Sequence, residues 1–96
     1  RSLVRTQSGV LIFMKWFLYI LRCSDGTYYT GVTTDVTRRM NEHNTSKRGA
    51  KYTRARRPVK VVYYSEYDSR SSAQKAEFDF KRLSRKQKES IINERQ

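Results

Sequence analysis

The sequence is poor in the residues that form disulfides and zinc sites. Cys23 is its one cysteine and His43 its one histidine, so it can form no internal disulfide and offers no cysteine–histidine zinc site. It also lacks a long apolar run, because Lys15 interrupts the first one well short of the ~20 residues of a membrane helix. No small-residue cleavage site of a secretion signal precedes Cys23. We therefore expect a cytoplasmic protein in a reducing compartment.

Acidic residues are also scarce. The chain has nine Asp and Glu residues and 21 Lys and Arg residues, which gives a formal net charge of +12 in 96 residues. Such a charge repels itself in a compact chain, and a polyanionic partner relieves the repulsion. A membrane surface is polyanionic, but Tyr, Thr, Gly and Pro interrupt the basic stretches, which therefore form no long amphipathic helix. The composition favours nucleic acid as partner over a membrane.

The size and the apolar content predict a single folded domain. Hydrophobic residues make up 36% of the chain and aromatic residues 12%, enough for one core. Residues 1–13 lack periodicity, and Met14 precedes a strong strand pattern, so we interpret residues 1–13 as a disordered leader or tag. The predicted domain spans residues 14–92, and residues 93–96 form a tail.

The apolar pattern predicts three strands. The run Lys15–Leu21 is almost uniformly apolar, as expected for a central strand that is covered on both faces. A turn at 24–26 joins it to Tyr28–Thr33 as an antiparallel hairpin, and Val59–Tyr67 is the third strand. The turn leaves two registers open. A two-residue loop places Tyr19 and Tyr29 on opposite faces, whereas a three-residue loop with Gly26 in the left-handed conformation places them on one face.

Capping signals predict three helices. Asp35 is a candidate N-cap, and Ser71 with Gln74 and Ser84 with Gln87 are candidate capping boxes. Residues 44–58 are predicted to be a loop because they contain a glycine and end at a proline. The order β-β-α-β-α-α predicts an α/β fold of the α+β type, a three-stranded antiparallel sheet flanked by helices. It does not fit a double-stranded-RNA-binding domain or an RNA-recognition sheet.

Three hydrophilic residues lie on helix faces that should pack inward: Arg39, His43 and Glu77. Each has a structural explanation as well as a functional one. Arg39 could lay its aliphatic stem along the edge of the core, and His43 could be a structural residue near a helix end. Glu77 could pair with Lys81 four residues later, an exposed interaction worth about 0.3–0.5 kcal/mol. The functional alternative is that the three converge on the sheet.

The pattern as a whole resembles the GIY-YIG endonucleases, in particular their small stand-alone, YhbQ-like branch. Tyr19 ends Phe-Leu-Tyr, Tyr29 begins Tyr-Thr-Gly, Arg39 follows ten residues later, and Glu77 lies in a later helix. The likeness extends from residue 14 to the last helix. The first tripeptide lacks its glycine, and Thr30 replaces the usual isoleucine.

The resemblance implies hydrolysis of phosphodiester bonds by a metal-dependent endonuclease with a role in DNA repair or recombination. Glu77 resembles the ligand of one divalent ion, Mg²⁺ or Mn²⁺, and Arg39 resembles the phosphate clamp. Tyr29 resembles the residue that activates the water, Tyr19 a hydrogen-bonding partner, and His43 an auxiliary group. Because a phenol in water ionises only near pH 10, nearby positive charge would have to favour the phenolate. The assignment also selects the three-residue hairpin loop.

The loop at 44–58 is the predicted nucleic-acid-binding segment. Its cations could follow a phosphate backbone while an aromatic ring stacks on a base, although a solvated basic loop would have the same composition. DNA is favoured over RNA, no small-molecule cofactor is expected, and protein partners are unknown. A non-catalytic module that retains the fold and the charge is the alternative function. The predicted binding residues are Lys47, Arg48, Lys51, Tyr52, Arg54, Arg56 and Arg57.

Overall fold

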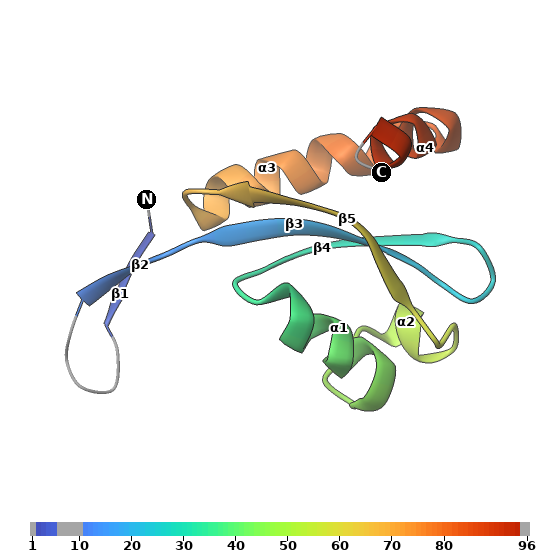
Figure 1. The fold of residues 1–96 in the computed structure, drawn as a ribbon, viewed down its shortest axis with the longest axis horizontal. Helices are drawn as coiled ribbons and strands as arrows, with labels where there is room; N and C mark the ends of the chain where they lie inside the picture. The colour runs from blue at the N-terminus through green and yellow to red at the C-terminus, as the bar shows by residue number, and fades with distance from the viewer. Residues whose placement is uncertain (1, 6–10, 95–96) are drawn as a thin grey trace.

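A three-stranded antiparallel sheet with helices on both faces forms the body of the molecule (Figure 1). The computed structural model describes residues 2–5 and 11–94. The sheet contains β3 (Trp16–Arg22), β4 (Tyr28–Thr33) and β5 (Lys60–Tyr67), in the order β4-β3-β5. The predicted α+β fold is confirmed.

In the ranges that the structure describes, four helices cover the sheet. In Figure 1, α1 (Val36–Thr45) and the single turn α2 (Lys51–Arg54) lie on one side of it. The helices α3 (Arg70–Lys81) and α4 (Arg85–Glu94) lie on the other. Among the described residues, none of these helices has the length and the apolar character needed to cross a bilayer.

The central strand β3 has the burial that its apolar run predicts. Leu18, Tyr19, Ile20 and Leu21 are each at most 4% exposed. Alternate side chains enter different clusters: Tyr19 and Leu21 pack on the α1 side, and Ile20 packs with residues of α3 and α4. Alternation along one strand therefore divides the core into two layers.

The hairpin between β3 and β4 has the three-residue loop. The Cys23 N–H donates to the Thr27 carbonyl at 2.8 Å, and the Gly26 N–H donates to the Cys23 carbonyl at 2.9 Å. Gly26 has φ of 84°, the left-handed conformation that glycine adopts without steric cost. In this register Leu21 pairs with Tyr29 and Tyr19 pairs with Gly31. Tyr19 and Tyr29 therefore lie on one face of the sheet.

The caps are partly as predicted. The Arg38 N–H donates to Asp35 Oδ1 at 3.0 Å, which confirms Asp35 as the N-cap of α1. Ser84 and Gln87 bond reciprocally before α4, at 2.9 and 3.2 Å, which confirms that capping box.

The predicted box of Ser71 and Gln74 is wrong. The N-cap of α3 is Ser69, whose hydroxyl accepts from the Ser72 N–H at 3.1 Å. A serine can cap a helix at either position, so the backbone conformation decides which one does. Ser69 has the extended conformation of an N-cap residue, with φ of −143° and ψ of 158°.

Two segments contain more regular structure than the sequence predicted. Part of the predicted loop at 44–58 is helical, because α1 continues through Thr45 and α2 adds one turn. Within the predicted disordered leader 1–13, β1 (Ser2–Arg5) and β2 (Leu11–Met14) pair as an antiparallel hairpin. Residues 1 and 6–10 lie outside the described residues, as do 95 and 96 of the predicted tail. The interpretation of residues 1–13 as a leader or tag stays a prediction.

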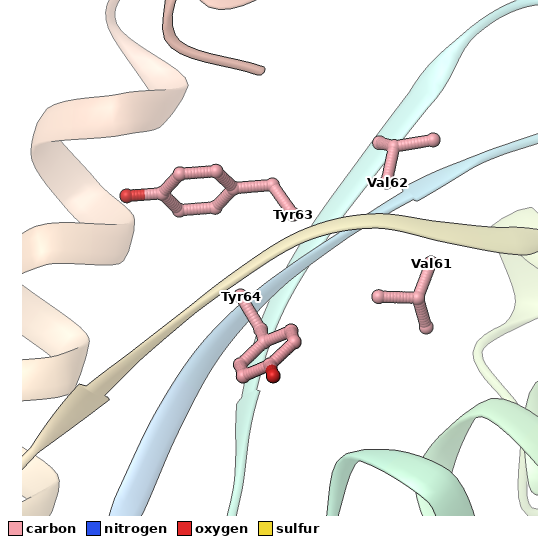
Figure 2. A pocket seen from close by; sticks show the side chains of 4 residues that line it. All are labelled: Val61, Val62, Tyr63 and Tyr64. Carbon is pink, nitrogen blue, oxygen red and sulfur yellow. The ribbon is translucent and has the colours of Figure 1, made fainter. Parts of the chain in front are cut away.

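A bulge interrupts β5 at the sheet edge. Ile20 pairs with Tyr63 and Leu21 with Val61, which leaves Val62 as the extra residue. Figure 2 shows the result, with Val62 and Tyr63 on one side of the strand and Val61 and Tyr64 on the other. The four side chains line a cavity of about 250 Å³. Val61 packs in the layer on the α1 side, whereas Val62 and Tyr63 both pack in the layer of α3 and α4.

Candidate functional site

Tyr19 is the buried centre of the candidate site. It lies on β3 with 1% of its surface exposed, and its Oη is 2.8 Å from His43 Nε2 on α1. Its ring lies across Gly31 of β4. A Cβ at that glycine would be 2.5 Å from Tyr19 Oη and 2.7 Å from its Cζ, closer than real Cβ atoms approach other atoms. The glycine of the Tyr-Thr-Gly motif is therefore required because the phenol occupies the space of a side chain.

Tyr29 lies between this buried centre and the surface. Its ring centroid is 6.4 Å from that of Tyr19 and 5.0 Å from that of His43. On its other side the Tyr52 ring of α2 stacks on it at 6.2 Å, and Tyr52 is 38% exposed. Tyr29 is half-buried. Its ring is therefore held between aromatic neighbours on both sides.

His43 lies fully inside this cluster, with 0% of its surface exposed. Besides the contact with Tyr19, its Nδ1 lies 2.9 Å from Thr53 Oγ1 and 3.2 Å from the Ala50 N. Burial lowers the pKa of His43 to about 4, and the positive charge of Arg39 acts in the same direction. The imidazole is therefore neutral near pH 7. Its place beneath the tyrosines suits a supporting role, and it has no surface with which to touch a substrate.

Arg39 lies one turn before His43 on α1. Its Nη1 donates to Glu42 Oε1 at 2.9 Å and to the Arg48 carbonyl at 2.8 Å, and the side chain is 25% exposed. Burial raises the pKa of Tyr19 to about 12, as does the phenol of Tyr29, whereas the adjacent Arg39 guanidinium lowers it. A cation thus lies beside the Tyr19 phenol.

Glu77 approaches the site from a different direction. It lies on α3, which covers the opposite face of the sheet, and its side chain is 23% exposed. Its carboxylate is near enough to Tyr19 to contribute to the raised pKa of that phenol. It also forms the alternative contact, an ion pair with Lys81 Nζ at 3.2 Å. The contact of Glu77 that the structure shows is therefore the helical ion pair, and its relation to Tyr19 is electrostatic.

The donor set for a metal ion is small. In the part of the chain that the structure describes, no group of three or more His, Cys, Asp or Glu side chains could hold an ion. Glu77 is one partly buried carboxylate whose charge acts on the Tyr19 phenol. Mg²⁺ and Mn²⁺ prefer oxygen ligands, and Mg²⁺ keeps several waters, so a single carboxylate together with a substrate phosphate fits such an ion.

The predicted binding segment divides into exposed and structural cations. Lys47, Arg48, Lys51 and Arg54 are exposed. The Arg57 guanidinium instead donates to the carbonyls of His43 and Ser46, each at 2.6 Å. Arg57 thus ties the end of α1 to the loop.

Arg56 also has partners within the protein. Its guanidinium lies 3.8 Å from the centroid of the Tyr52 ring, and its Nε donates to Asp25 Oδ2 at 3.0 Å. The Ser24 N–H donates to the Arg56 carbonyl at 2.9 Å. These contacts join the β3–β4 turn to the basic segment.

Sequence reasoning missed two features of the site. Thr53 is completely buried against His43, although no pattern around it distinguishes it from an exposed threonine. A groove of about 270 Å³ also opens beside Tyr29. It is lined by Tyr28, Tyr29, Thr30, Tyr52, Lys81 and Lys88. The basic character of the end of α3 and of α4 was the signal that could have indicated it.

The chain is similar to known sequences over most of its length. The sequence model of one family, described as the GIY-YIG catalytic domain, matches residues 15–90. UPF0213 protein lin0209 of Listeria innocua is 55% identical over 80 residues, 83% of this chain and 88% of that protein. UPF0213 protein VNG_2274C of Halobacterium salinarum is 54% identical over 75 residues, 78% of this chain and 96% of that protein.

Two solved structures have a similar fold. The solution NMR structure of the UPF0213 protein BH0048 from Bacillus halodurans has 45% identity and a TM-score of 0.54, and the match covers 83% of this chain and 84% of that one. The solution NMR structure of EF2693 from E. faecalis has 47% identity and a TM-score of 0.57, with 82% and 83% covered.

Proposed function

The chain belongs to the GIY-YIG catalytic-domain family, and from this premise we propose that it is a metal-dependent endonuclease that hydrolyses phosphodiester bonds. One observation carries the proposal: Tyr19 and Tyr29 share one face of the sheet, with the Arg39 guanidinium beside Tyr19. A structural role alone does not account for a buried phenol with a cation beside it and a second, half-buried phenol next to it.

Arg39 is the proposed phosphate clamp. Hydrolysis of a phosphodiester adds negative charge to a group that is already anionic, so a fixed cation stabilises the transition state more than the ground state. A guanidinium can bind two phosphate oxygens at once, which also orients the phosphorus. Glu42 and the Arg48 carbonyl hold this guanidinium in place before any substrate arrives.

Tyr29 is the proposed base. With Tyr29 as the phenolate, a water oxygen forms a bond to phosphorus, the water's proton passes to the phenolate oxygen to give the neutral phenol, and the opposite phosphorus–oxygen bond breaks. The leaving oxygen takes up a proton from solvent. Tyr19 has a different role, because its pKa of about 12 keeps it a neutral phenol and only 1% of its surface is exposed. It is the proposed hydrogen-bonding partner that, with His43, supports the site from beneath Tyr29.

Glu77 is the residue that would hold one Mg²⁺ or Mn²⁺ ion, whose positive charge would offset the negative charge that develops on the phosphate oxygens in the transition state. The contact with Lys81 holds the carboxylate in position without the ion. Lys81 also lines the groove beside Tyr29, where its ammonium suits a phosphate.

The finer parts of the proposal concern the substrate and the setting. We propose DNA rather than RNA as the polymer, a role in repair or recombination, and a cytoplasmic location. The exposed cations Lys47, Arg48, Lys51 and Arg54 would contact the phosphate backbone. A backbone-directed surface gives little sequence preference, so the shape of the substrate has to supply specificity.

Cleavage of labelled oligonucleotides tests the proposal. Single-stranded, duplex, flap and branched DNA and RNA are incubated with Mg²⁺ or Mn²⁺. We expect Tyr29→Phe, Arg39→Ala and Glu77→Gln each to lower kcat by a factor of about 100 or more while binding is largely retained. Asp79→Asn is the matched control, because it removes an exposed carboxylate from the same helix. Cleavage at the wild-type rate by Glu77→Gln would remove the metal assignment.

The second candidate function is a non-catalytic nucleic-acid-binding module. The ion pair between Glu77 and Lys81 favours it, because it already satisfies the carboxylate that the metal requires. This alternative predicts tight, salt-sensitive binding and no cleavage of any substrate in the set. The wild-type protein in the same assay decides between the two functions.

A further inference from the structure

A groove crosses one edge of the sheet next to Tyr29. The strand at this edge is β4, because the order of the sheet is β4-β3-β5. The groove has a volume of about 270 Å³, and side chains from both sides of the sheet line it. Tyr52 comes from α2 on one side, whereas Lys81 and Lys88 come from α3 and α4 on the other (Figure 1). A ligand in this groove would contact both layers of helices.

Tyr52 also joins this groove to the basic segment 47–57. It lines a second groove, of about 770 Å³, together with the exposed cations Lys51 and Arg54. Because Tyr52 lines both grooves, the two are adjacent on the surface. A polyanionic strand that follows the cations of both grooves therefore passes Tyr29, the proposed base.

The turn between β3 and β4 holds the walls of the groove in place. Arg56, which follows α2, donates from Nε to Asp25 Oδ2 at 3.0 Å. Arg85 of α4 donates from Nη2 to the Gly26 carbonyl at 2.9 Å, and its guanidinium lies 4.9 Å from the centroid of the Tyr28 ring. Both α2 and α4 are thus tied to the same turn, so the groove is formed before a ligand binds.

Lys88 is a cation without an acidic partner. It is half-buried, and its Nζ lies 5.7 Å from the centroid of the Phe80 ring. Within residues 2–5 and 11–94, its side chain forms no hydrogen bond or ion pair. Because burial of a charge is costly unless the charge is paired, its position in a groove favours an external anion.

Lys81 lies in the same groove with a partner already bound. Its Nζ is 3.2 Å from the Glu77 carboxylate, and 55% of the side chain is exposed. An ammonium has three donors, so Lys81 can bind a second anion while it keeps this ion pair. Two ammonium groups therefore line the groove on the side of α3 and α4.

We propose that Lys88, together with Lys81, forms a second phosphate-binding subsite, which holds the nucleic-acid backbone across β4 from the basic segment. The inference rests on the proposed function, because it places the same polymer beside Tyr29. Lysine ammonium groups bind phosphate as point charges, and the tyrosine rings of the groove suit the adjoining base or sugar. A backbone that is held on both sides of the edge strand cannot pivot at Tyr29.

Matched lysine variants of α4 test the subsite by binding alone. Lys88→Gln and Lys86→Gln each remove one positive charge from the same helix, but Lys86 is exposed and does not line the groove. Anisotropy titrations use a labelled single-stranded oligonucleotide. We expect Lys88→Gln to make the slope of log K against log salt shallower by about 0.7, the loss of one phosphate contact. Lys86→Gln should leave the slope unchanged, and equal slopes in the two variants would overturn the subsite.

Chemical-shift mapping of the wild-type protein locates the ligand without any variant. The ¹⁵N-labelled protein is titrated with the same oligonucleotide, unlabelled. Shifts confined to the basic segment would overturn the subsite. We expect amide signals on both sides of the edge strand to move, namely those of Tyr28, Tyr29, Thr30, Tyr52, Lys81 and Lys88.

The outcomes separate this inference from the proposed function. If Lys88→Gln binds like Lys86→Gln while the wild-type protein cleaves its substrate, the subsite is wrong and the nuclease function stands. If the wild-type protein cleaves nothing but Lys88→Gln has the shallower slope, the nuclease function is wrong and the subsite stands. If Lys88→Gln does not fold, the chemical-shift map decides.

Discussion

At the scale of single residues, Gly31 sets the space available to Tyr19. An added methyl group would be 2.5 Å from the phenol oxygen, so Tyr19 would have to move away from His43. We expect Gly31→Ala to lower the free energy of unfolding by roughly 1–3 kcal/mol, as measured by urea denaturation. In a Tyr19→Phe background the cost should be smaller, because the closest atom is missing. An equal cost in both backgrounds would contradict the contact.

Also at the scale of single residues, His43 makes the stability of the fold depend on pH. Its pKa is about 4 in the folded protein, below the ~6.5 of an exposed histidine, so between these values the unfolded state binds more protons. The contribution of neutral His43 to the free energy of unfolding is fully present above pH ~6.5. It falls as the pH approaches 4, by roughly 3 kcal/mol in total. Urea unfolding across this range measures it. His43→Gln, the control, should lose this part of the pH dependence, and an unchanged profile would contradict the assignment.

At the scale of elements, α2 and its flanks carry cations with two different tasks. Arg57 holds two carbonyls, whereas within the described part of the chain the Arg54 side chain makes no hydrogen bond or ion pair. We expect Arg57→Gln to lower the free energy of unfolding by roughly 1.5–3 kcal/mol. Arg54→Gln should leave stability within about 0.5 kcal/mol and weaken nucleic-acid binding. Thermal unfolding and fluorescence anisotropy of a labelled oligonucleotide compare this matched pair. Equal stability of the two variants would contradict the division.

At the scale of the whole molecule, the net charge of +12 predicts binding that weakens steeply with salt. Contact with about five or six phosphates gives a slope of log K against log salt near −5 on duplex DNA. Removing Lys51 and Arg54 together, each by substitution with Gln, should make that slope shallower by about two. Anisotropy titrations across a range of salt concentrations measure it. A slope near zero would show that phosphates are not the ligand.

The sequence by itself determined the features that depend on neighbouring residues. The uniform apolar run predicted the buried central strand, and the positions of Asp35 and Ser84 predicted two helix starts. The motif residues predicted the family, which the comparisons confirm. These features follow from strand alternation and from side-chain bonds to nearby backbone N–H groups, which act within a few residues.

The tertiary structure alone decided how those pieces meet. The turn chemistry permitted two registers, and the packed sheet adopts the one that places Tyr19 and Tyr29 on one face. The contacts of Thr53 with His43 and of Arg57 with the end of α1 join residues ten or more positions apart. Which donor reaches which acceptor over such separations depends on how the helices pack on the sheet. That packing buries Thr53, ties Arg57 to the backbone and leaves Arg54 exposed, although the sequence presents all three as members of one basic loop.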